Sequence, residues 1–364
     1  MSGTILEGGT TTKTVLSSTR RRFLLSFLLV LPLGLLNGWP RGFQTQTARY
    51  RNWSSSRNIT ILLWYWPFGR SFSLKGDVCW DLYSIPHCRL VDQRSLFPSA
   101  DVVVFHNKEL AVRRQNLPLH LPRPRGQRWA WMSLEAPAHN GNLSQYANIF
   151  NMTITYRRDA DVTVPYGELL PKKAEGHLAE DVPQNKSFLA CWVVSNYRNR
   201  HKRSQVYKEL NATVPVKVYG RWTKTPLRSS VLLPTISRCY FYLAFENSIA
   251  KDYITEKLWR NAYQGGAVPV VLGPPLEDYK AMAPPNSFIH VDEFASVKDL
   301  GKYLQQLAED KKRYSEYFTW KRQWKVKLSI DWRERVCKIC SQYNSLPQEK
   351  IYSDLEAWVK ANNS

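Results

Sequence analysis

Two series of short, uninterrupted apolar runs constrain the fold of this chain most strongly. The first series comprises ITILLWYW (59–66), ADVVVFH (100–106), RWAWMSLE (128–135) and FNMTITY (150–156). The second comprises FLACWVVS (188–195), VPVKVYG (214–220), CYFYLAFENS (239–248) and AVPVVLG (267–273). Continuous apolar runs of this length are typical of strands buried on both faces of a parallel sheet.

Polar segments of helical length separate these runs. The predicted helices are NKELAVRRQN (107–116), NRHKRSQVYKELN (199–211), TEKLWRNAYQGG (255–266), SVKDLGKYLQQLAED (296–310) and a segment at 314–327. The Pro- and charge-rich stretch 165–186 divides the two series and is interpreted as an interdomain link. Strands that alternate with helices in two halves predict an α/β fold with two Rossmann-like, doubly wound domains facing a cleft.

Ligands of such sheets bind beyond the carboxyl ends of the strands, which directs attention to the polar residues there. Glu135 follows the third run and could serve as a general base or, alternatively, as a helix cap or loop carboxylate. Ser195 and Asn196 precede a helix start that contains Arg203, an arrangement suited to a diphosphate or, equally, to a solvated basic helix face. Glu256 and Lys257 could bind sugar hydroxyls and phosphate, or lie on an ordinary surface helix.

The net charge and the absence of several known motifs limit which classes of function are expected. Lys and Arg number 51 against 30 Asp and Glu, a net charge of +21, which favours anionic partners. No RNA-recognition, zinc-finger or basic-zipper signature is present, so nucleic acid is not expected as a partner. The sequence contains neither a Gly-x-Gly-x-x-Gly nor a Walker motif. RDAD (158–161) contains two aspartates but is crowded by arginines, which suggests that protein cations rather than a metal neutralise charge.

The N-terminus predicts membrane insertion. Residues 1–22 end in three arginines and are expected to be a cytosolic tail, followed by a transmembrane signal-anchor at 23–39 and a polar stem at 40–58. A cleaved signal peptide is the alternative, although no clean cleavage site follows the apolar run.

Sequons and cysteines agree with a lumenal chain. Potential N-glycosylation sites begin at Asn52, Asn58, Asn142, Asn151, Asn185, Asn211 and Asn362. The six cysteines, Cys79, Cys88, Cys191, Cys239, Cys337 and Cys340, favour three disulfides, whose pairing counting alone leaves open. Cys337-x-x-Cys340 could be half a zinc site, but no second Cys-x-x-Cys or His pair completes one.

Residues 59–360 resemble the animal α1,3-fucosyltransferases, the Lewis-type enzymes of the Golgi. The longest matching segment is FYLAFENSIAKDYITEKLWRNAYQGGAVPVVLGP (241–274), and shorter ones are SADVVVFH, WAWMSLEAP, YRRDADVTVPYG, CWVVSN and DWRERVCKIC. The resemblance implies a GT-B fold, with an acceptor-binding domain at 59–175 and a GDP-fucose-binding domain at 176–364 whose C-terminal helices return to the first domain. It also implies pairing of Cys79 with Cys337, Cys88 with Cys340 and Cys191 with Cys239.

The resemblance further implies inverting transfer from GDP-β-L-fucose without an essential metal or other cofactor, by a 4-galactosyl-N-acetylglucosaminide 3-α-L-fucosyltransferase. Glu135 matches the general base. The implied donor contacts are Tyr166, Ser195, Asn196, Arg203, Tyr242, Asn247, Glu256 and Lys257.

Two departures from relatives concern the acceptor. Relatives often read HHR or HHW where this chain has His106-Asn107-Lys108, and the basic Lys108 favours α1,3 transfer onto type 2 lactosamine. Arg70 could pair with the carboxylate of a sialylated acceptor. Lactosamine-bearing glycoproteins or glycolipids and the Golgi membrane are therefore the expected partners. A homodimer and a cleaved, secreted form are compatible with the sequence. A catalytically inactive, lectin-like relative and a basic membrane-surface binder are the alternative functions.

Overall fold

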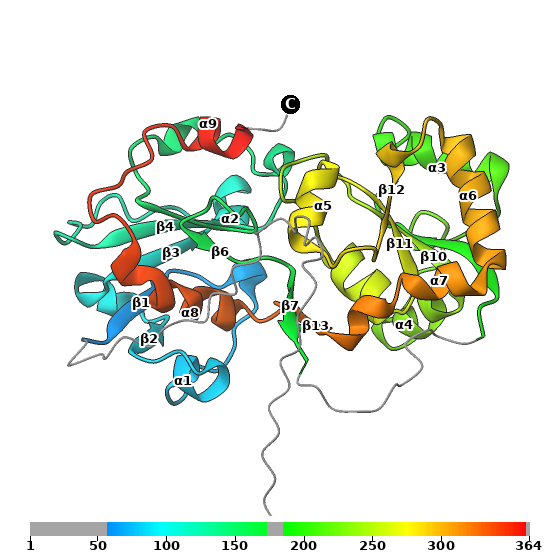
Figure 1. The fold of residues 1–364 in the computed structure, drawn as a ribbon. Helices are drawn as coiled ribbons and strands as arrows, with labels where there is room; N and C mark the ends of the chain where they lie inside the picture. The colour runs from blue at the N-terminus through cyan, green and yellow to red at the C-terminus, as the bar shows by residue number, and fades with distance from the viewer. Residues whose placement is uncertain (1–56, 173–184, 362–364) are drawn as a thin grey trace, which may run out of the picture. The chain divides into compact units, whose positions relative to one another are not determined.

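Two parallel β-sheets carry the apolar runs in the computed structural model, which describes residues 57–172 and 185–361 (Figure 1). The predicted tail, the anchor and nearly all of the stem lie outside the described residues. Within the described ranges, no helix has the length and apolar character needed to span a bilayer. The prediction of an α/β fold with two parallel sheets is confirmed.

The first sheet has six parallel strands in the order β2-β1-β3-β4-β5-β6. They are β1 (Ile59–Leu63), β2 (Cys88–Val91), β3 (Val102–His106), β4 (Arg128–Ser133), β5 (Met152–Thr155) and β6 (Val162–Thr163). Every side chain of β3 and β4 is buried, as continuous apolar runs require. The associated helices are α1 (Val78–Tyr83) and α2 (Asn107–Ala111), the latter shorter than predicted, together with α8 (Trp332–Gln342) and α9 (Leu355–Lys360) from the C-terminal part of the chain. Val336 and Leu355, from α8 and α9, are fully buried in the two cores of this sheet.

The second sheet has five parallel strands in the order β12-β11-β10-β8-β9. They are β8 (Phe188–Val193), β9 (Val216–Tyr219), β10 (Cys239–Phe245), β11 (Val268–Leu272) and β12 (Ile289–His290). The associated helices are α3 (Lys202–Thr213), α4 (Ser229–Ser237), the π-helix η5 (Lys257–Gln264), α5 (Leu276–Met282), α6 (Val297–Glu309) and α7 (Lys311–Glu316). Leu210 of α3 and Leu304 of α6 share one core of this sheet, and Leu258 of η5 belongs to the other.

One prediction about the second half of the chain is wrong. A helix is predicted at 314–327, but this segment ends in strand β13 (Trp324–Leu328), whose partner β7 (Gly167–Pro171) lies in the stretch 165–186 between the two sheets. The two strands pair antiparallel. WKVKL alternates apolar and polar residues with a period of two, which favours a strand that packs one face on a core.

Gly265 and Gly266 end η5, as predicted, for two different reasons. Gly266 adopts a φ of +69°, in the left-handed region that glycine favours. Gly265 has an ordinary helical φ, but a Cβ at this position would collide with the Asn261 carbonyl oxygen and with Ile236. A π-helix is rare and is often found near functional sites.

Three disulfides close the fold, in the pairing that the resemblance implies. Cys79–Cys337 and Cys88–Cys340 attach α8 to α1 and β2, across 258 and 252 residues of sequence. Cys191–Cys239 joins the neighbouring strands β8 and β10. Among the described residues, the only group of three potential metal ligands is Cys79, Cys88 and Cys337, and all three are consumed by these disulfides.

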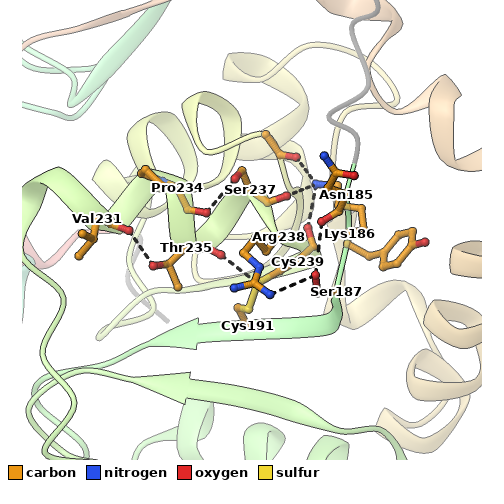
Figure 2. Close-up of a disulfide and its surroundings, with 12 residues drawn as sticks. Asn185, Lys186, Ser187, Cys191, Val231, Pro234, Thr235, Ser237, Arg238 and Cys239 are labelled. Carbon is orange, nitrogen blue, oxygen red and sulfur yellow. Dashed lines mark hydrogen bonds between the residues drawn. A yellow bond between two sulfur atoms is a disulfide. The ribbon is translucent and has the colours of Figure 1, made fainter.

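Lys186 anchors the start of the second sheet beside this third disulfide (Figure 2). Its ammonium group donates to the carbonyl oxygens of Ser237, Cys239 and Gly266 at 3.0, 2.9 and 2.6 Å. Burial lowers the pKa of Lys186 to about 7. Three carbonyl acceptors use all three ammonium hydrogens, so this geometry is best satisfied by the protonated side chain.

Arg158, between β5 and β6 of the first sheet, connects with the segments that follow β10 and β11 of the second sheet. Its backbone N–H and Nε donate to the Asp252 carboxylate at 2.9 and 2.6 Å, and its second terminal nitrogen donates to Asp278 at 2.7 Å. The Asp252 side chain is fully buried, and its backbone N–H donates to Asp278 at 2.9 Å. In RDAD, Asp159 pairs with Arg157 and Asp161 accepts from Lys350 and Tyr352. Protein groups therefore occupy both RDAD carboxylates.

We predict that Arg158→Gln destabilises the protein by about 2–3 kcal/mol, because the buried Asp252 carboxylate loses its cation. Urea denaturation of the purified protein measures this change. Lys251→Gln is the matched control, since it removes only a 3.4 Å pair with the half-exposed Asp159 and should change the free energy of unfolding by less than about 1 kcal/mol. Equal, small changes in the two variants would contradict the prediction.

Candidate active site

Four polar residues form a cluster where β10 ends and η5 begins. The Glu246 carboxylate accepts from the backbone N–H of Thr255 at 2.8 Å and from its hydroxyl at 2.8 Å. Lys257 Nζ lies 3.0 Å from Glu246, 3.2 Å from Glu256 and 2.8 Å from the Thr255 hydroxyl. The side chain of Glu246 is 1% exposed, that of Lys257 17% and that of Glu256 49%. Glu256 and Lys257 are therefore accessible to a ligand, whereas Glu246 lies buried beneath them.

The electrostatics of this cluster follow from burial. Burial alone would lower the pKa of Lys257, but the Glu246 and Glu256 carboxylates raise it above its ordinary value. Burial raises the pKa of Glu246, and Lys257 only partly offsets this. Burial acts to raise the pKa of Glu256 as well, but the charge and hydrogen bond of Lys257 oppose this effect. The pKa of Glu256 is lowered as a result. Lys257 is therefore a fixed cation held between two carboxylates.

A second buried cation comes from α3. Burial lowers the pKa of Arg203, and the Glu246 carboxylate partly opposes this effect. Arg203 donates to the backbone oxygen of Asn196, while its Nε is buried without a partner. The Asn247 side-chain oxygen is likewise buried without a partner among the described residues. Unsatisfied buried polar atoms cost free energy, so both atoms are candidates for hydrogen bonds to a ligand.

Tyr253 and Tyr166 connect this cluster with the segment that contains Glu135. The Tyr253 ring lies 5.0 Å from the ring of Tyr156 and 6.3 Å from that of Tyr166. Burial, with the charges of Glu246, Glu135 and Glu256, raises the pKa of Tyr253. The Tyr166 hydroxyl donates to the Leu134 carbonyl oxygen at 2.6 Å, directly before Glu135. Tyr253 was not predicted from the sequence, because only the folded chain places it between these carboxylates.

Glu135 lies at the carboxyl end of β4, as predicted. Its backbone N–H donates to the Ser133 hydroxyl at 3.2 Å, and its side chain is half-buried. Among the described residues, no hydrogen-bond donor or ion-pair partner contacts its carboxylate. Burial raises the pKa values of Tyr156, Tyr166 and Tyr253, and the Glu135 carboxylate contributes to each of these shifts.

The remaining predicted donor residues divide into two groups. Ser195 and Asn196 are exposed directly after β8, before α3. Tyr242 is fully buried, and its hydroxyl accepts from the Asn261 side chain at 3.0 Å. It lies in the core beneath η5 and supports that helix, and its donor contact stays a prediction.

The predicted acceptor residues lie near a buried pair. His106 Nδ1 lies 2.5 Å from Glu109, whose other carboxylate oxygen accepts from the Phe68 backbone N–H at 2.7 Å. The exposed Phe68 ring lies 5.9 Å from Trp332, and Arg70 follows it closely in the chain. Arg70 is exposed and forms no ion pair with any residue in 57–172 or 185–361. Lys108 is half-buried on α2, between His106 and Glu109 in sequence.

The sequons differ in accessibility. Asn58, Asn142, Asn185 and Asn211 are exposed. Asn151 is half-buried, its amide nitrogen donates to the Lys350 carbonyl oxygen at 2.9 Å, and its oxygen accepts from the Trp129 N–H at 3.0 Å. Asn52 and Asn362 lie outside the described residues.

Comparison with protein families finds two matches that together cover most of the chain. Residues 56–167 match the family described as "Fucosyltransferase, N-terminal", and residues 183–358 match "Glycosyltransferase family 10 (fucosyltransferase) C-term". The interval between them corresponds to the stretch between the two sheets.

Individual relatives agree with these matches. The chain is 47% identical to α-(1,3)-fucosyltransferase 7 of Homo sapiens, over 83% of this chain and 86% of the relative. It is 39% identical to 4-galactosyl-N-acetylglucosaminide 3-α-L-fucosyltransferase 9 of Bos taurus, over 88% and 90%. A crystal structure of an α1,3-fucosyltransferase with GDP-fucose superposes with a TM-score of 0.52 at 19% identity, covering 83% of this chain and 94% of that one. This last likeness supports the fold alone.

We predict that Lys257→Met destabilises the protein by about 3 kcal/mol at about pH 7.5, because the buried Glu246 carboxylate loses its ammonium partner. The folded-state pKa of Glu246 is already raised above its unfolded value of 4.5, and the substitution raises it further. The unfolded chain therefore loses the Glu246 proton at a lower pH than the folded chain does. The free energy of unfolding then falls as the pH rises from about 4.5 towards the folded-state pKa. The deficit should therefore be smaller at about pH 5.

Urea denaturation at the two pH values measures this difference. Lys280→Met is the matched control, because its 2.9 Å partner Glu277 is 78% exposed and needs no compensation. A deficit in Lys257→Met that does not change with pH would contradict the prediction.

Proposed function

The chain belongs to the animal α1,3-fucosyltransferases of glycosyltransferase family 10, and on this premise we propose that it transfers L-fucose from GDP-β-L-fucose to an N-acetyllactosamine acceptor. The observation that carries the proposal is a pair of cations near one buried carboxylate, the buried Arg203 and the largely buried Lys257, connected through Tyr253 and Tyr166 with the segment of Glu135. A nucleoside diphosphate requires such cations, and a glycosyl transfer requires a base close to them.

The proposed reaction is a single displacement. The Glu135 carboxylate takes the proton of the acceptor 3-hydroxyl, and the hydroxyl oxygen forms a bond to the anomeric carbon of fucose. The bond from that carbon to the β-phosphate oxygen breaks, and its electron pair leaves with GDP. Attack opposite the leaving group converts the β-linked donor into an α-linked product.

Arg203 and Lys257 stabilise the charge that develops on the departing diphosphate. Because Arg203 is buried and Lys257 is held by Glu246 and Glu256 before the donor binds, little reorganisation is needed as the charge moves. Two protein cations supply the stabilisation that a divalent metal provides in other enzymes. We therefore propose that no metal or other cofactor is essential. Asn247, Ser195, Asn196 and Glu256 are proposed to contact the donor's polar groups, and Tyr166 to hold the backbone before Glu135.

The test is transfer from GDP-fucose to N-acetyllactosamine, measured with and without EDTA. We expect transfer to survive EDTA and Glu135→Gln to reduce turnover on the order of 10²- to 10⁴-fold, the range for loss of a general base. Glu209→Gln, an exposed carboxylate on α3, is the control and should retain full activity. Unchanged turnover in Glu135→Gln would exclude this base. Acceptor binding without transfer or donor hydrolysis would favour an inactive, lectin-like relative.

We propose α1,3 transfer onto type 2 lactosamine, which makes Lewis x or sialyl Lewis x glycans, on the basis of Lys108. The His106–Glu109 pair supports the acceptor side by holding the backbone of Phe68, two residues before Arg70. The predicted signal-anchor and three disulfides support a Golgi-membrane protein with a lumenal catalytic part.

Arg70→Gln tests whether this chain favours sialylated acceptors. The exposed guanidinium is available for the sialic acid carboxylate, and exposed charge pairs contribute up to about 1 kcal/mol. We expect the ratio of kcat/KM for sialylated over neutral lactosamine to fall about two- to fivefold. Arg89→Gln, an exposed arginine of β2, is the control. An unchanged ratio in Arg70→Gln would exclude this role.

A further inference from the structure

A groove outside the candidate active site lies beside β12, the edge strand of the second sheet. Its volume is about 610 Å³, and residues of β12, α6, α7 and the turns beside them line it. In Figure 1 these elements occupy the yellow to orange part of the chain. The volume is within the range of small-molecule sites. No predicted donor or acceptor residue lines this groove, so it is a separate feature of the molecule.

Aromatic rings form much of the groove wall. The rings of Phe294 and Tyr303 lie 5.2 Å apart, and the hydroxyls of Tyr303 and Tyr317 are hydrogen-bonded at 2.8 Å. Burial and this hydrogen bond raise the pKa of Tyr317, so its phenol stays neutral. Half-buried tyrosines present an apolar face together with a hydroxyl group. A sugar ring offers the complementary surface, with C–H groups on its faces and hydroxyls around its edge.

Charged groups at the groove indicate which sugars fit. Arg313 lies over the Tyr303 ring at 5.7 Å, and Glu293 and Glu316 contribute carboxylates. Within the described residues, neither Arg313 nor Glu316 has an ion-pair partner, while Glu293 accepts from the His290 N–H at 3.0 Å. One arginine against two glutamates gives the lining a charge of −1, although the whole chain carries +21. Such a lining disfavours anionic ligands and leaves donors and acceptors available for hydroxyl groups.

We propose that this groove binds a neutral saccharide, a hexose or N-acetylhexosamine unit of a glycan, independently of the active site. The aromatic walls would contact the ring faces, Glu316 and the Tyr303 hydroxyl oxygen would accept from sugar hydroxyl groups, and Arg313 would donate to them. If the proposed function holds, one branch of a branched glycan can occupy this groove while another reaches the active site. The tethered branch is then presented at a raised effective concentration.

Calorimetric titration without GDP-fucose tests binding directly, with a desialylated biantennary N-glycan as the probe. The double variant Tyr303→Phe, Glu316→Gln removes a hydroxyl and a charge while it retains the ring and the side-chain size. Loss of these hydrogen bonds should weaken binding at the groove about three- to tenfold. Lys312→Gln, an exposed neighbour on α7 that does not line the groove, should bind like the wild type.

Transfer kinetics provide a second measurement. The double variant should raise KM for a branched, desialylated glycoprotein about three- to tenfold and leave KM for the free disaccharide unchanged. Arg313→Gln, whose exposed side chain lies over the Tyr303 ring and lines the groove, repeats the test if the double variant fails to fold. Groove binding that persists without any transfer would contradict the proposed function but support the groove.

Three results would overturn the proposal. The first is equal affinity of wild type and variants for the neutral glycan. The second is tighter groove binding by the sialylated form of the same glycan, which would contradict the charge argument. The third is a KM for the disaccharide that rises as much as that for the branched glycoprotein, which would place the effect in the active site.

Discussion

The ion network of Arg158 with Asp252 and Asp278 determines how the parts of this site are arranged. Glu135 follows a strand of the first sheet, whereas Lys257 and Glu256 begin the π-helix that follows the second sheet's third strand. Arg158 belongs to the first group of elements, and Asp252 lies five residues before Lys257. Asp252 is fully buried and is hydrogen-bonded through both its backbone and its carboxylate. These bonds connect the segment that follows β5 with the segment that precedes Lys257.

Buried charges account for the rest of the site. Glu246 is too deeply buried to contact a ligand, yet it orients Thr255 and Lys257 through hydrogen bonds and an ion pair. Arg203 approaches the same carboxylate from α3. The diphosphate that we propose for this site would meet cations that are positioned during folding. The partner of Lys257 that remains exposed, Glu256, is available for uncharged hydroxyl groups of a donor.

Sequence reasoning predicted the sheets better than the connections. The apolar runs identify strands such as β3 and β4 because total burial removes the need for alternation. The helix predicted at 314–327 is wrong over WKVKL, because the prediction extended the helical pattern of the preceding residues across a short strand. The apolar residues of that strand repeat with a period of two. Strand alternation turns Tyr242 towards the core under η5, on the face opposite Phe241, and its donor contact stays a prediction. Glu246 and Tyr253 acquire their importance only through tertiary contacts, which local pattern does not contain.

The return of α8 and α9 to the first sheet has a consequence for biosynthesis. Cys337 and Cys340 are made some 250 residues after the cysteines they join, and both cores of the first sheet contain side chains from these late helices. The N-terminal sheet therefore cannot complete its core while the ribosome is still translating the second half. The order of translation and the order of folding differ, and incomplete chains expose apolar surface to the chaperones of the compartment where they emerge.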